Sequence, residues 1–191
     1  MPEHASPLAQ YNPLPGLSQR SCAVLVQYHA WPDTYAEMAG ILAAHCGVSG
    51  APLPGKAMPG SGVSLLRVHP QRLWLISAQP RGYPVLGPEV GAALDLSHAR
   101  TIIHVADEIA LPLLSRFIAI DLRPHRFAVD GVAVTPLHRV SVVLWRRADG
   151  IDILAPRSFA RSIWELLGEA TSASASARPR AAGPAARGCL P

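Results

Sequence analysis

Residues 141–154 read SVVLWRRADGIDIL, and this stretch decides the fold. Two apolar runs, 141–145 and 151–154, flank the tripeptide Ala148-Asp149-Gly150. β-Branched and aromatic residues favour strands, and an Asp-Gly pair between two such runs is a strong signal for a tight hairpin turn. The sequence therefore predicts an antiparallel β-hairpin in the C-terminal half of the chain.

The residues before this hairpin predict a strand followed by a helix. Residues 101–105 (TIIHV) are typical of a strand, and Asp107 and Glu108 suit the first turn of a helix that runs to Phe117. Pro112 would lie past the first turn of that helix, where proline costs about 3 kcal/mol. We therefore expect the helix to start later or to kink.

Two further elements complete this half. Residues 127–135 predict a strand that is broken at Asp130-Gly131. Residues 157–167 predict a last helix, since their apolar positions recur at helical spacing. Gly168 follows that helix and is typical of a residue that ends one.

The N-terminal half repeats the same order. Residues 22–28 (CAVLVQY) predict a strand. Thr34 and Glu37 have the spacing of a capping box at the start of a helix, with Asp33 as the alternative cap, and Gly47 ends that helix.

The Pro/Gly-rich stretch 49–62 predicts a loop. Residues 63–77 then predict a hairpin that turns at His69-Pro70. The order strand–helix–strand–strand therefore occurs twice. It predicts an α+β fold of two similar halves, with helices on one face of mostly antiparallel sheet.

Composition fits one domain with two terminal segments. The chain has 191 residues, of which 49% are apolar and 16% are charged, against a usual share of about 25% charged. Residues 1–19 hold four of the 19 prolines and predict an extended arm. Residues 171–191 are rich in Ser, Ala and Pro and predict a disordered tail. We expect one α+β domain over 20–170, with halves at about 20–80 and 94–170.

The charge and cysteine content exclude several classes of protein. The formal net charge of +4 has its excess largely near the two ends, so no clustered cations indicate nucleic-acid binding. No apolar run approaches the ~20 residues needed to cross a membrane. The three cysteines form no C-x-x-C motif, which favours a reducing compartment. We expect a cytoplasmic protein.

The motifs of metal and nucleophile chemistry are incomplete. His98 and His104 lie six residues apart and need not face each other, and no H-x-x-x-H motif occurs, so we expect no metal site. Residues 60–62 (GSG) lack the first glycine of the nucleophile-elbow pattern and the third glycine of the dinucleotide loop. A reactive cysteine would need a basic neighbour, and the sequence indicates none.

The acidic residues leave two hypotheses open. Asp95, Asp107 and Asp121 are the candidates for acid–base work, but each position is also typical of a turn or a helix cap. The pair Arg146-Arg147 could bind a partner's carboxylate. From the residues alone, the chain is either a non-catalytic subunit whose apolar surface is covered by partners, or a small domain that binds an anionic ligand.

Several stretches carry a family resemblance. They read LDLSHARTIIHV (94–105), IDLRP (120–124), VLWRR (143–147) and ILAPRSFARSIWELL (153–167), with RLWLI (72–76) in the first half. Together they resemble the γ subunit of heterotetrameric sarcosine oxidase, and PRSFARSIW (156–164) is the most specific part. The resemblance covers roughly residues 20–168.

The resemblance implies a fold like the folate-binding domain of aminomethyltransferases. It also implies a complex with α, β and δ subunits, in which partner subunits carry the FAD, FMN, NAD and tetrahydrofolate sites. That complex converts sarcosine to glycine by oxidative demethylation. The implied role of this chain is to support assembly, with no cofactor and no catalytic residue of its own.

One site residue follows from the resemblance. Asp121 falls where aminomethyltransferases have a folate-contacting acid in an N-D-V motif. Ile120 replaces the asparagine of that motif here. The resemblance therefore leaves a folate contact at Asp121 as an alternative. The equivalent subunit of a related N-methyl amino acid dehydrogenase complex is a second alternative.

Overall fold

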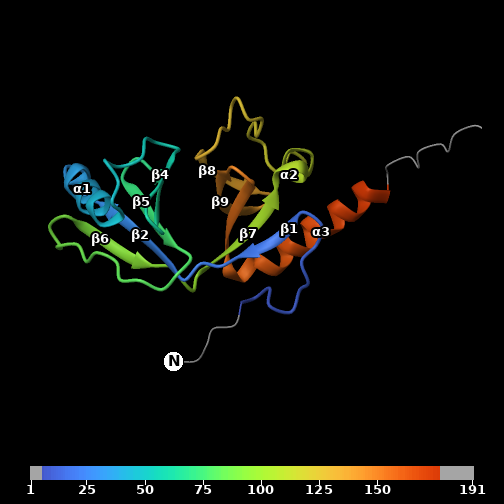
Figure 1. Ribbon diagram of the computed structural model, residues 1–191, viewed down its shortest axis with the longest axis horizontal. Helices are drawn as coiled ribbons and strands as arrows, with labels where there is room; N and C mark the ends of the chain where they lie inside the picture. Colours follow the sequence, from blue (N-terminus) through green and yellow to red (C-terminus); the bar gives the residue numbers. More distant parts are fainter. Residues whose placement is uncertain (1–5, 177–191) are drawn as a thin grey trace, which may run out of the picture.

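The computed structural model describes residues 6–176 and contains two five-stranded antiparallel sheets (Figure 1). The strands are β1 (Leu17–Arg20), β2 (Val24–Ala30), β3 (Ala57–Pro59), β4 (Ser64–His69), β5 (Arg72–Ser77), β6 (Gly91–Asp95), β7 (Arg100–Ala106), β8 (Val132–Leu137), β9 (Val140–Arg147) and β10 (Gly150–Pro156). The helices are α1 (Tyr35–Cys46), α2 (Asp107–Leu114), a 3₁₀ turn (Arg157–Phe159) and α3 (Ala160–Ser176).

The two halves exchange their edge strands. The first sheet has the order β1-β7-β10-β9-β8, and the second has the order β3-β4-β5-β2-β6. β1 directly precedes β2 in the chain but pairs with β7, where Leu17 lies opposite Val105. β6 directly precedes β7 but pairs with β2, where Val26 lies opposite Asp95. Each half therefore supplies the edge strand that completes the sheet of the other half.

Strand alternation divides the molecule into layers. Successive side chains of a strand point to opposite faces, so Ile151 and Ile153 of β10 pack under α2 and α3, while Asp152 and Leu154 face the other sheet. Helix α1 covers the outer face of the second sheet in the same way.

The inner faces of the two sheets meet in an apolar cluster, which we call the seam. Its largest members are Leu25, Leu66, Trp74 and Ile76 from the second sheet, and Ile102, Val143, Trp145 and Leu154 from the first. A backbone bridge between Lys56 and Gly131 also joins the two sheets. The seam therefore unites both halves in one folded body.

The predicted α+β class and both predicted hairpins are confirmed. Helix α1 lies where the sequence predicts it and ends at Gly47, which has a φ of 66°. The predicted capping box is wrong, because the Thr34 hydroxyl donates to the Val90 carbonyl at 2.5 Å and makes no cap bond. Helix α2 begins at Asp107 with Pro112 inside it, so a later start is wrong, and it ends at Leu114 instead of Phe117.

Two other expectations need correction. The predicted stop at Gly168 is wrong, because α3 continues to Ser176. A Cβ at Gly168 would lie 2.7 Å from Leu14 Cδ1, so this glycine serves close packing against the N-terminal segment. Strand β3 lies within residues 49–62, where the sequence predicts only a loop.

The terminal segments contribute more to the folded structure than their composition suggests. Within the arm expected over 1–19, Leu8 is buried in the core under α3, and β1 occupies the sheet edge. Most of the expected tail, residues 177–191, lies outside the described residues. The domain limits at 20 and 170 therefore stay a prediction, although β1 and α3 extend across them.

Candidate functional site

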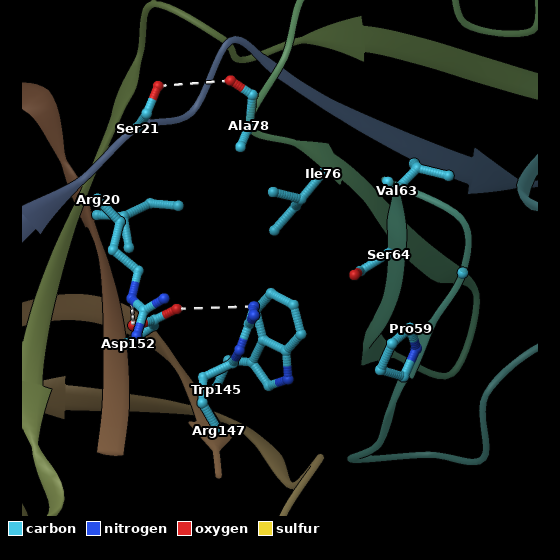
Figure 2. A pocket seen from close by; sticks show the side chains of 13 residues that line it. Arg20, Ser21, Pro59, Val63, Ser64, Ile76, Ala78, Trp145, Arg147 and Asp152 are labelled. Atoms are coloured by element: carbon cyan, nitrogen blue, oxygen red, sulfur yellow. Dashed lines mark hydrogen bonds and ion pairs between the residues drawn. The ribbon is translucent and has the colours of Figure 1, made fainter. Parts of the chain in front are cut away.

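A cavity of about 410 Å³ opens at one end of the seam, and we call it the inter-sheet cavity (Figure 2). Both halves line it: Arg20, Ser21, Ile102, Trp145, Arg147 and Asp152 on one side, and Pro59, Gly60, Gly62, Val63, Ser64, Ile76 and Ala78 on the other. Its volume is within the range of small-molecule sites. It is therefore the candidate functional site.

Asp152 is the buried charge of this cavity. It is 1% exposed, because its position on β10 directs it between the sheets. Its Oδ1 lies 2.9 Å from Arg20 Nε and 2.8 Å from His104 Nδ1. Burial raises the pKa of the Asp152 carboxyl, while Arg20 and His104 oppose that shift. Asp152 is thus a buried carboxylate whose Oδ1 atom already contacts Arg20 and His104.

The exchanged strand β1 brings Arg20 to this carboxylate. Arg20 also pairs with Asp149, which lies in the β9–β10 turn. His104 stands opposite Asp152 in the register between β7 and β10. With Asp152 ionised, His104 carries its proton on Nδ1 and donates it to the carboxylate. Three strands therefore build one ionic cluster.

Arg147 is held differently from Arg20. Its guanidinium stacks on the Trp145 ring, with 4.0 Å from Cζ to the ring centroid. Its ion pair with Asp152 spans 3.9 Å, which is beyond hydrogen-bond distance. The Trp145 Nε1 atom is buried without a hydrogen-bond partner among the described residues. On the cavity wall, the Arg147 guanidinium is therefore a donor group that protein acceptors leave largely unsatisfied.

The arrangement offers binding groups but no convergent catalytic set within the described residues. No group of three or more metal-ligating side chains occurs there. Burial raises the pKa of both Cys22 and Cys46 to about 11, so neither is a thiolate near neutral pH. Gly60 and Gly62 lie on the cavity rim, where the Gly60 N–H donates to the Val63 carbonyl at 2.7 Å.

The structure places Asp121 away from this cavity, in the loop between α2 and β8. Its carboxylate receives the Arg123 guanidinium in a fork, at 2.9 Å to Nε and 2.6 Å to Nη2. Hydrogen bonds from Arg123 hold the pKa of Asp121 well below its usual range. The folate contact at Asp121 stays a prediction.

The other acidic candidates also have protein partners. Asp95 receives hydrogen bonds from the Tyr83 hydroxyl and from the Ser97 backbone N–H. Asp107 pairs with the buried Arg146 at 2.6 Å. These contacts give both aspartates a structural role.

Sequence reasoning considered Arg147 and His104 but missed Arg20 and Asp152. A signal existed for Asp152, which is the one charged position in the apolar run 151–154. Such a residue on an inward-facing strand position needs a buried partner. No local signal marks Arg20, because its role follows from the pairing of β1 with β7, far away in sequence.

The fold and the cavity define a class: an α+β protein of two interlocked halves, with an ionic cavity between its sheets. No family model matches the chain. In fold, the chain is similar to a chain in the structure of heterotetrameric sarcosine oxidase from Corynebacterium sp. U-96 in complex with pyrrole 2-carboxylate. That match has a TM-score of 0.77 and 26% sequence identity, and it covers 92% of this chain and 98% of that one.

Sequence comparison finds the same group of proteins. Sarcosine oxidase subunit gamma of Arthrobacter sp is 28% identical over 103 residues, which is 51% of this chain and 51% of that protein. The subunit gamma of Corynebacterium sp. (strain U-96) is 33% identical over 73 residues, or 38% of this chain and 36% of that protein. The aligned part thus spans about half or less of these relatives. The resemblance to sarcosine oxidase γ subunits is confirmed in sequence and in fold.

Proposed function

We propose that this chain is a γ-type, non-catalytic subunit of a sarcosine oxidase-like complex, which demethylates sarcosine to glycine oxidatively. The observation that carries this proposal is the fold match over 98% of a chain from heterotetrameric sarcosine oxidase. A match of that extent involves both halves and the seam, not one shared motif.

The surface supports a role in assembly. Several large apolar side chains are exposed on the described part of the chain, among them Leu53 (72%), Val85 (89%) and Leu94 (55%). Partner subunits commonly cover such residues. In this proposal the partners are α-, β- and δ-type subunits, and they hold the FAD, FMN, NAD and tetrahydrofolate.

Co-expression with the large flavoprotein subunits tests the proposal. The affinity-tagged full chain should retain a yellow flavoprotein through size-exclusion chromatography, and the complex should form peroxide when sarcosine is added. Expression of the same partners without this chain is the control, and it should yield less assembled complex. A chain that stays a monodisperse monomer beside these partners would refute the proposal.

The two alternatives have their own tests. A subunit of a related dehydrogenase complex predicts turnover of another N-methyl amino acid, such as N-methylglutamate, in preference to sarcosine. A stand-alone folate-binding protein predicts that the chain alone binds tetrahydrofolate in calorimetry and loses binding in Asp121→Ala.

The expected location in the cytoplasm is part of the proposal. Cys22 and Cys46 are both free thiols, as in a reducing compartment. Within residues 6–176, none of the helices has the length and apolar character to cross a membrane.

A further inference from the structure

The side chains that line the inter-sheet cavity carry more positive than negative charge. Two guanidinium groups, Arg20 and Arg147, face one carboxylate, Asp152. The second carboxylate near Arg20, Asp149, belongs to the exposed turn and has a side chain that is 62% exposed to solvent. Arg20 forms ion pairs with both of these aspartates. Arg147 is the cation whose hydrogen-bonding capacity the described residues leave largely unused.

Arg147 is also held in a shape that suits an anion. The Trp145 ring holds the guanidinium, whose Cζ lies 4.0 Å from the ring centroid, and a guanidinium is a planar fork of N–H donors. The side chain is 36% exposed and lines the cavity. A planar fork of this kind matches the two oxygens of a carboxylate.

The remaining wall indicates the body of the ligand. Ile76, Ile102 and Val63 line the cavity with apolar surface, and Figure 2 places Trp145 between the Arg20–Asp152 pair and Ser64.

We propose that the inter-sheet cavity binds a small molecule with one carboxylate on a flat apolar body, and that Arg147 holds the carboxylate. A monoanion balances the excess positive charge of the lining. The Arg20 guanidinium, with Nε 2.9 Å from Asp152 Oδ1, offsets the repulsion between Asp152 and the ligand. The apolar body lies against Ile76, Ile102 and Trp145. This inference is independent of the proposed role in a sarcosine oxidase-like complex.

Equilibrium dialysis of the full chain, alone or in the assembly with which it is purified, tests the site with benzoate as the probe. We expect one benzoate per chain with a Kd on the order of 1 mM or tighter. Benzamide lacks the charge and acetate lacks the ring, so each should bind at least about tenfold more weakly. Equal binding of benzoate and benzamide would overturn the assignment of a carboxylate site.

Variants assign the binding to Arg147. Arg147→Gln should weaken benzoate binding by about tenfold or more, because it removes the charged donors. Arg161→Gln is the matched control, since Arg161 is 65% exposed on α3 and outside the cavity, and it should bind as the wild type does. Thermal unfolding of both variants checks that they fold. A folded Arg147→Gln protein with wild-type affinity would refute the proposal, as would non-saturating uptake by the wild type.

Discussion

Asp152 shows how one buried residue depends on its neighbours. A carboxylate that is 1% exposed loses its hydration, and the ion pairs with Arg20 and Arg147 and the contact with His104 offset that cost. The net stabilisation of such a cluster is small. Removing a single partner is costly, however, because it leaves buried charge or donors without compensation.

We predict that Asp152→Ala lowers the free energy of unfolding by about 3 kcal/mol or more, since Arg20 and His104 lose their shared acceptor. Asp121→Ala is the matched control. Its pair with Arg123 lies at the surface, so we expect a much smaller loss than for Asp152→Ala. Urea unfolding of the three proteins measures both values, and equal losses would contradict the buried cluster.

The pH dependence of stability tests the same carboxyl. Burial raises the pKa of Asp152 in the folded state above its unfolded value, so the folded protein binds its proton more tightly. The stability from this group is complete below the unfolded pKa and is lost as the pH rises through the folded pKa.

Asp152→Asn removes this titration while keeping an oxygen that accepts hydrogen bonds. We therefore predict that the wild type loses stability relative to Asp152→Asn as the pH rises from about 4 to 7. Urea midpoints measured at several pH values give this difference. A difference that moves in the opposite direction would show that Arg20 and His104 outweigh burial.

At the scale of elements, sequence reasoning succeeded where the determinants are local. The hairpin of β9 and β10 follows from its turn residues, and α1 follows from its periodicity and Gly47. Strand β3 pairs with the adjacent β4, but its three residues, Ala57–Pro59, are too few to show a strand pattern. Strand β6 carries no such pattern, because its pairing partner β2 lies far away in sequence. The inter-sheet cavity was beyond prediction for the same reason, since it forms only when β1 delivers Arg20 to the other half.

Strand exchange makes a prediction about Leu17. This side chain of β1 is 1% exposed and packs in the core of the C-terminal half. Leu17→Ala should therefore lower the free energy of unfolding by about 2–5 kcal/mol. Amide hydrogen exchange should accelerate more in β7, which pairs with β1, than in β2, which follows β1 in the chain.

Ser18→Ala is the control for the Leu17 experiment, because Ser18 lies on the same strand but outside the apolar cores. It should leave exchange in β7 nearly unchanged. Faster exchange in β2 than in β7 after Leu17→Ala would show that β1 stabilises its neighbour in sequence and would contradict the exchange.

At the scale of the whole molecule, two features prevent either half from standing alone. Each sheet lacks an edge strand without the other half, and each inner face exposes its share of the seam. Figure 1 shows the two sheets side by side, and the chain crosses between them at the β1–β2 and β6–β7 connections. Repeated sequence order therefore does not imply independent folding units in this protein.

Fragments test this dependence. A cut after Gly82, in the loop between β5 and β6, gives pieces 1–82 and 83–191, which contain the wrong edge strands for their own sheets. We predict that each piece alone shows no cooperative thermal transition by circular dichroism, because the seam stays exposed to water. Mixing the two should restore β structure and a transition whose midpoint rises with concentration, since folding becomes bimolecular.

A mixture in which the second piece carries Leu154→Asp should fail to fold, because Leu154 is fully buried in the seam and the substitution would place a charge there. Cooperative folding of either piece alone would show instead that the halves are autonomous, and that the exchanged strands are dispensable for the core of each.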